Sequence, residues 1–106
     1  MLQIEGTILN QIMSILIDLV AILSCISPQI VEKCNLKSNK FRNVWLVQLA
    51  TKTERKVTSQ VKQCLLNLNG YSTIENLNIL PLRYYDLLIC MDWLEKQAVI
   101  INFLEK

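Results

Sequence analysis

Hydrophobic residues dominate residues 8–26, and polar residues interrupt this run at only a few positions. The pair Asn10 and Gln11 divides it into two β-prone segments, residues 6–9 and residues 12–17. Short apolar segments on either side of a polar pair are typical of two strands joined by a turn. We therefore expect a β-hairpin near the N-terminus.

The middle of the chain repeats this arrangement of apolar segments separated by polar ones. Residues 44–50 and residues 56–62 are both β-prone, and the polar segment 51–55 lies between them. Segments of this length and composition indicate a second hairpin, with an exposed tip at residues 51–55.

Three further strands are expected in the second half of the chain. Residues 64–69 form a candidate strand that ends at Gly70, and residues 74–80 form another that ends at Pro81. Residues 85–90 contain mainly apolar side chains and read as a buried strand. The chain is therefore rich in short strands.

Two short helices are also predicted. Ser27 followed by Pro28 is a typical helix start, with serine as the N-cap and proline at the first helical position, and this helix should end near Asn35. Asp92 and Glu95 have the D-x-x-E spacing of a second helix start, which makes Asp92 a helix-start residue rather than an acid or a base.

The last apolar segment, residues 98–103, predicts a final strand. The elements together predict a mainly β fold, a small closed β-barrel-like domain with one or two short helices. In a domain of this size, Trp45 and Trp93 are expected in the core rather than stacked on a ligand.

Length and composition fit one folded domain spanning residues 1–106. The hydrophobic fraction of 52%, with only 2 glycines and 2 prolines, is typical of a folded protein rather than a disordered one. The 11 basic and 9 acidic residues give a formal charge of +2 and form no charged block. This balance predicts no nucleic-acid partner.

The four cysteines do not have the spacing of a metal site. Cys25, Cys34, Cys64 and Cys90 form no Cys-x-x-Cys pair, and the chain has no histidine. We therefore expect no metal and no cofactor. Cysteines in apolar segments, without a basic signal region before them, are typical of reduced, buried residues in a cytoplasmic (intracellular) protein. A disulfide bond is the alternative that the sequence leaves open.

Residues 8–26 are also long enough to cross a membrane as a helix. A central aspartate costs roughly 2.5–3.5 kcal/mol on membrane insertion, which opposes this interpretation. Polar residues recur throughout the segment: Asn10, Gln11, Ser14, Asp18 and Ser24. We favour strands and expect no membrane association, with a small membrane protein as the less favoured alternative.

Asp18 is the only residue with a charged side chain in residues 14–31, which are otherwise largely apolar. Burying a carboxylate among apolar neighbours is costly unless the group is paired, hydrogen-bonded or protonated. One interpretation is a strand-end aspartate whose carboxylate accepts hydrogen bonds from nearby backbone N–H groups. The other is an aspartate that the protein uses in its chemistry.

Two sequence blocks favour the second interpretation. Residues 16–22, LIDLVAI, lead to Cys-Ile-Ser at residues 25–27, and residues 86–90, DLLIC, lead to Met-Asp-Trp-Leu at residues 91–94. In this order and at this separation, the blocks resemble the retropepsin-like aspartic peptidase domain of gypsy-type LTR retrotransposons. That family typically shows Leu-Ile-Asp-Ser-Gly-Ala-Thr and then Phe-Ile-Ser, followed later by Asp-Val-Leu-Ile-Gly and Met-Asp-Trp-Leu.

The resemblance implies the acid-protease fold, in which two protomers form a homodimer. Each protomer supplies one aspartate, here Asp18, to a pair of carboxylates that share a proton. One carboxylate then activates water as a general base toward a peptide carbonyl, and the other acts as a general acid. A polypeptide substrate or peptide ligand would lie under a flap, which the resemblance assigns to Thr51, Lys52, Thr53, Glu54 and Arg55.

The sequence departs from the family pattern around this aspartate. Leu19 and Val20 stand where the family has a small hydroxylated residue and glycine, and Ile22 replaces a threonine. Cys90 replaces the glycine of the second block. A hydroxyl group orients the carboxylate, and glycine permits a tight, close backbone that a β-branched residue tolerates badly.

Small misplacements of catalytic groups commonly cost a hundredfold or more in rate. We therefore predict a retropepsin-like aspartic endopeptidase domain, derived from a retrotransposon polyprotein, that is weakly active or inactive. The alternative is a non-catalytic module that dimerises or binds a peptide.

Overall fold

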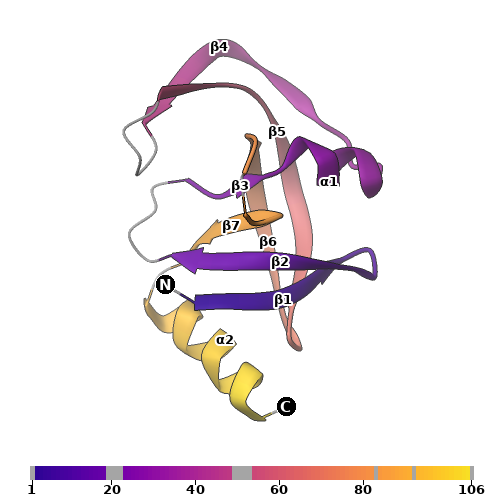
Figure 1. Cartoon of the computed structure of the whole chain (residues 1–106), viewed down its shortest axis with the longest axis vertical. Helices are drawn as coiled ribbons and strands as arrows, with labels where there is room; N and C mark the ends of the chain where they lie inside the picture. The colour runs from indigo at the N-terminus through magenta and orange to yellow at the C-terminus, as the bar shows by residue number, and fades with distance from the viewer. Residues whose placement is uncertain (1, 19–22, 49–53, 83, 92, 106) are drawn as a thin grey trace.

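The chain folds mainly into β-strands, with one helix between β3 and β4 and a second at its C-terminal end (Figure 1). The computed structural model describes residues 2–18, 23–48, 54–82, 84–91 and 93–105. In chain order the elements are β1 (Leu2–Ile8), β2 (Gln11–Asp18), β3 (Cys25–Ile26), α1 (Pro28–Lys33), β4 (Asn39–Gln48), β5 (Glu54–Leu68), β6 (Tyr71–Ile79), β7 (Leu87–Cys90) and α2 (Trp93–Glu105).

The predicted N-terminal hairpin is confirmed, with its turn one residue earlier than expected. β1 and β2 pair antiparallel from Leu2 opposite Ile17 to Ile8 opposite Gln11. The two turn residues, Leu9 and Asn10, have φ angles of 49° and 66°. Positive φ at both positions is the requirement of a type I′ turn, whose twist matches that of the flanking strands.

Six strands close into a mixed barrel. The sheet order is β1-β2-β7-β3-β6-β5-β4, and an added pairing of Thr7 in β1 with Asn67 in β5 closes the ring. Gly6 permits this closure, because a Cβ atom there would lie 2.9 Å from the Asn67 carbonyl oxygen and would also clash with Ile15. The closed barrel confirms the fold class that the strand pattern predicted.

Two strands predicted separately, residues 56–62 and residues 64–69, are parts of the single long strand β5. The register with β6 shifts between Val61 and Cys64, which is a β-bulge, and Gln63 inside it has a φ of 51°. The Gln63 backbone N–H donates to the Asn76 Oδ1 atom at 2.9 Å. The bulge therefore keeps its hydrogen bonding while it bends the strand.

The first helix is confirmed. α1 begins at Pro28, as expected, and the Gln29 backbone N–H donates to the Ser27 hydroxyl oxygen at 3.4 Å. The Cys34 backbone N–H donates to the Ile30 carbonyl oxygen at 2.9 Å, close to the predicted end. This short helix is thus defined at both ends by local sequence.

The predicted strand at residues 98–103 is wrong, because these residues belong to α2. The preceding residues 94–98, Leu-Glu-Lys-Gln-Ala, are good helix formers, and α2 contains no glycine or proline. Val99 is fully buried, so packing of the helix onto the barrel holds the β-branched residues 99–101 in a helix. The side chains of Trp45 and Trp93, expected in the core, lie outside the described part of the structure.

Buried aliphatic side chains from the strands fill the barrel. Ile15, Ile17, Leu66, Leu87 and Ile89 have no exposed surface, and each contributes roughly 1.5–3 kcal/mol through burial. All four cysteines are free thiols: three are buried, and Cys90 is half-buried. Among the described residues, no helix is both long and apolar enough to cross a membrane.

Candidate active site

Asp18 is the last residue of β2 and lies outside the core. Along this strand Met13, Ile15 and Ile17 are buried, whereas Ser14, Leu16 and Asp18 alternate with them and are half-buried. Because successive side chains of a strand point to opposite faces, the Asp18 carboxylate lies on the face opposite the buried Ile17 side chain. Asp18 therefore lies outside the core although its neighbours in sequence are apolar.

A parallel pairing of β2 with β7 brings Asp18 beside Cys90. The two strands pair from Ile15 opposite Leu87 to Asp18 opposite Cys90. The register is fixed at the other end, where the Ser14 backbone N–H donates to the Asp86 carboxylate at 2.8 Å and the Asp86 backbone N–H donates to the Ser14 carbonyl oxygen at 2.9 Å. The last residues of β2 and β7, one from each sequence block, thus lie side by side.

Ser24, in the segment that follows residues 19–22, forms hydrogen bonds with β7 and β6. The Cys90 backbone N–H donates to the Ser24 hydroxyl oxygen at 2.9 Å. The Ser24 carbonyl oxygen accepts from the backbone N–H of Asn78 at 2.9 Å and from its side-chain amide at 3.1 Å. Sequence analysis did not single out Ser24 for this role, because a serine before a two-residue strand has no distinctive pattern.

The surroundings of Cys90 favour the protonated thiol. Burial raises its pKa first, and the negative charges of Asp18 and Glu75 raise its pKa further. Because the thiolate is the nucleophile, these surroundings disfavour reaction of Cys90 as a nucleophile. Burial also raises the pKa of Cys25 to about 11.

The predicted flap lies only partly within the described residues. Thr51, Lys52 and Thr53 fall outside them. β4 and β5 form the predicted hairpin, with Gln48 opposite Glu54 and Val47 opposite Arg55. The contact of these flap residues with a bound peptide stays a prediction.

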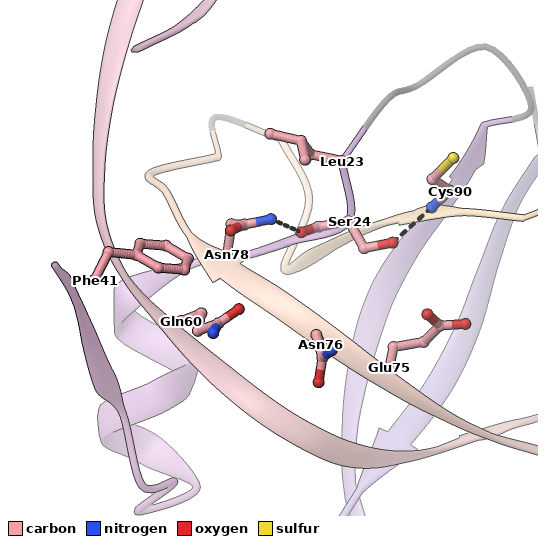
Figure 2. Close-up of a pocket in the computed structure, with 8 residues that line it drawn as sticks. All are labelled: Leu23, Ser24, Phe41, Gln60, Glu75, Asn76, Asn78 and Cys90. Atoms are coloured by element: carbon pink, nitrogen blue, oxygen red, sulfur yellow. Dashed lines mark hydrogen bonds between the residues drawn. The ribbon is translucent and has the colours of Figure 1, made fainter. Parts of the chain in front are cut away.

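Figure 2 shows a cavity of about 400 Å³ close to the end of β7. Its lining includes Cys90, which is the register partner of Asp18. Five of the lining residues carry polar side chains other than thiols, and these come from β5, β6 and the segment before β3: Ser24, Gln60, Glu75, Asn76 and Asn78. Leu23 and Phe41 are the apolar members.

No metal centre accompanies these groups in the described ranges, where no three histidine, cysteine, aspartate or glutamate residues are arranged to hold a metal ion.

The sequence model for the family described as retroviral aspartyl protease matches residues 3–106. The chain belongs to the retroviral aspartyl protease family. Membership in the retroviral aspartyl protease family confirms the retropepsin-like resemblance, whereas a gypsy-type origin stays a prediction. No curated protein sequence gives a match.

Two solved structures share this fold. The retroviral protease-like domain of Ddi1 from Leishmania major is 22% identical with a TM-score of 0.63, over 92% of this chain and 78% of that chain. A protein of unknown function from Legionella pneumophila is 13% identical with a TM-score of 0.50, over 95% of this chain and 84% of that chain. At these identities, the likeness shows the fold alone.

Proposed function

We propose that this chain is a retropepsin-like aspartic endopeptidase domain, derived from an intracellular retrotransposon polyprotein, whose catalytic activity is weak or lost. The observation that carries the proposal is the position of Asp18, at the end of β2 and in register with the last residue of β7. An aspartyl protease requires an aspartate at its reactive centre, and this chain has only Asp18, Asp86 and Asp92.

Asp18 is the best candidate of the three. The Asp86 carboxylate accepts a hydrogen bond from the Ser14 backbone and holds β2 against β7, which is a structural role. Asp92 lies outside the described residues, and the D-x-x-E spacing with Glu95 predicts a helix-start residue. Asp18 is half-buried, and its register partner Cys90 lines a cavity.

The proposed chemistry requires two chains. A single protomer supplies one Asp18 carboxylate, and the family mechanism uses two, so the active unit is a homodimer with one carboxylate from each chain. Two carboxylates a few ångströms apart share one proton and titrate as a pair. The ionised carboxylate takes a proton from water as it attacks the peptide carbonyl, and the protonated carboxylic acid protonates the leaving amine.

Weak activity follows from the residues around Asp18. Leu19 offers no hydroxyl group to orient the carboxylate, and Val20 replaces a glycine at a tight turn. Both residues lie outside the described part of the structure, so this argument rests on their chemistry. Cys90 adds a half-buried side chain at the register partner of Asp18, where the family pattern has glycine.

The experiment restores the family pattern. Peptide cleavage at mildly acidic pH is compared for the unmodified chain, for the triple variant Leu19→Ser, Val20→Gly and Cys90→Gly, and for that triple variant with Asp18→Asn added. We expect the triple variant to cleave at least a hundredfold faster than the unmodified chain, and Asp18→Asn to abolish the gain.

Each other outcome has a definite meaning. Rapid cleavage by the unmodified chain, abolished by Asp18→Asn alone, would mean a working peptidase and would contradict the proposed loss of activity. Cleavage that survives Asp18→Asn would remove Asp18 from the mechanism.

The cavity that Cys90 lines favours a second candidate function, a non-catalytic module that dimerises or binds a peptide. Its polar lining does not depend on the altered residues 19, 20 and 22. Folded dimers that bind peptides, with no cleavage by any variant, would favour this second candidate.

A further inference from the structure

The cavity that Cys90 lines has polar side chains on two sides, and a carboxylate on only one of them. In Figure 2 the side chains of Gln60, Asn76 and Glu75 line one side, and those of Asn78, Ser24 and Cys90 line the other. None of its described lining residues is basic. Any positive charge that enters the cavity therefore meets the Glu75 carboxylate without a competing cation from these residues.

Hydrogen-bond acceptors in the cavity remain available. The Asn78 side-chain amide donates to the Ser24 carbonyl oxygen at 3.1 Å, which leaves the Asn78 Oδ1 atom without a donor among the described residues. The Gln60 side chain makes no hydrogen bond within the same residues. Together with Glu75, these groups offer several oxygen atoms to a ligand that carries several N–H donors.

Glu75 has no cationic partner among the residues that the structure describes. Its carboxyl group is half-buried on β6, and the Thr73 hydroxyl donates to it at 3.4 Å. Burial raises the Glu75 pKa first, the negative charge of Glu95 on α2 raises it further, and the Thr73 hydrogen bond lowers it. A carboxylate in this situation gains stability when a cation is placed beside it.

We propose that this cavity is a specificity subsite that accepts a basic side chain, arginine or lysine, of a peptide lying across Asp18. Arginine fits the lining best, because its guanidinium has five N–H donors and no acceptor, and the cavity is lined by the Glu75 carboxylate and by the side-chain amides of Gln60 and Asn78. A cavity of about 400 Å³ is large enough for this side chain.

The position of the cavity links it to the peptide path. Cys90 lines the cavity and is the register partner of Asp18. The backbones of Cys90 and Asp18 therefore lie about one strand spacing apart. Phe41 of β4 and Gln60 of β5 come from the hairpin whose tip is the predicted flap. A peptide held between this hairpin and Asp18 would pass the mouth of the cavity.

This inference rests on the proposed function, because it assumes that a peptide is held beside Asp18. The probes are pools of eight-residue peptides, with arginine, lysine, citrulline or leucine fixed at each position in turn and the other positions randomised. Citrulline has the shape of arginine without its charge. Cleavage is measured with the triple variant described above, and binding is measured with the unmodified chain.

We expect arginine pools to be cleaved and bound about tenfold better than citrulline pools at one fixed position, which corresponds to about 1.4 kcal/mol. Glu75→Gln should remove this preference, and Glu75→Lys should favour a pool with glutamate at that position. Glu32→Gln, which makes the same charge change at an exposed position on α1, should leave the preference intact.

The two proposals can fail separately. Cleavage at equal rates for the arginine and citrulline pools would overturn the subsite and leave the peptidase proposal standing. If no pool is cleaved, the peptidase proposal fails and the binding comparison decides the subsite. A preference for arginine that depends on Glu75 would then support it, and equal binding of the two pools would overturn it.

Discussion

At the scale of single residues, the site depends on a few hydrogen bonds between segments that are far apart in sequence. The Ser24 hydroxyl accepts from the Cys90 backbone, and the Ser24 carbonyl accepts from Asn78. Ser24 therefore connects β7 and β6 to the segment that returns from Asp18. These hydrogen bonds join three segments that are between 12 and 66 residues apart in sequence.

Ser24→Ala should destabilise the fold by about 1–3 kcal/mol, because it leaves the Cys90 backbone N–H without its partner in a largely buried place. Chemical denaturation of the purified protein measures this change. Ser72→Ala, at an exposed position of β6, is the matched control and should stay within about 0.5 kcal/mol of the unmodified chain. A loss for Ser24→Ala no larger than the control's would mean that the hydroxyl contributes nothing to stability.

Glu75 gives the stability of the protein a pH dependence of definite sign. Its folded-state pKa is raised above the ordinary value of 4.5, chiefly by burial and then by Glu95 on α2. The folded state therefore prefers the protonated carboxyl group. The stability from this preference is fully present below about pH 4.5 and is lost as the pH rises through the raised pKa.

Glu75→Gln cannot ionise, so it should be more stable than the unmodified chain at pH 7, by less than about 1 kcal/mol because the carboxyl group is half-exposed. The difference should vanish below pH 4. Thermal unfolding between pH 3.5 and 8 measures it, with Glu32→Gln as the control. A Glu75→Gln variant that is less stable at pH 7 would mean that the ionised carboxylate stabilises the fold.

At the scale of elements, local sequence was sufficient where turns and caps decide the structure. Ser27 and Pro28 predicted α1 correctly. The N-terminal hairpin was also predicted, and its turn lies only one residue from the expected position. The C-terminal segment failed because Val99 and its β-branched neighbours favour a strand locally, whereas packing of Val99 against the barrel holds them in a helix. Asp18 could be found from its sequence block, but the cavity could not, because its lining comes together from four strands, β4, β5, β6 and β7, and from the segment before β3 only after the barrel closes.

Barrel closure depends on Gly6. Alanine at this position would place its Cβ atom 2.9 Å from the Asn67 carbonyl oxygen and against Ile15, so Gly6→Ala should cost about 1–3 kcal/mol through overpacking. Denaturant unfolding measures the loss. Thr7→Ala, at the next residue of β1, changes the sequence without adding a side chain to the crowded place and should cost less. Equal costs for the two variants would contradict the role assigned to close approach of β1 and β5.

At the scale of the whole molecule, the proposed chemistry makes activity a property of two chains. The described protomer holds one Asp18 at the end of β2, and the proposed mechanism needs a second carboxylate from another chain. A monomeric enzyme and a homodimeric one therefore differ in how an inactive chain affects an active one. An inactive chain leaves a monomeric enzyme unchanged, but it removes active partners from a dimeric one.

This difference can be measured by mixing two variants. The triple variant with Asp18 intact is equilibrated with increasing amounts of the triple variant that carries Asp18→Asn, at a constant concentration of the intact chain. For random pairing, an equal amount of the Asp18→Asn chain should reduce cleavage to about one half, and a ninefold excess should reduce it to about one tenth. The same amounts of an unrelated protein are the control. Activity that stays constant across the series would show that one chain is sufficient and that the pair of Asp18 carboxylates does not exist.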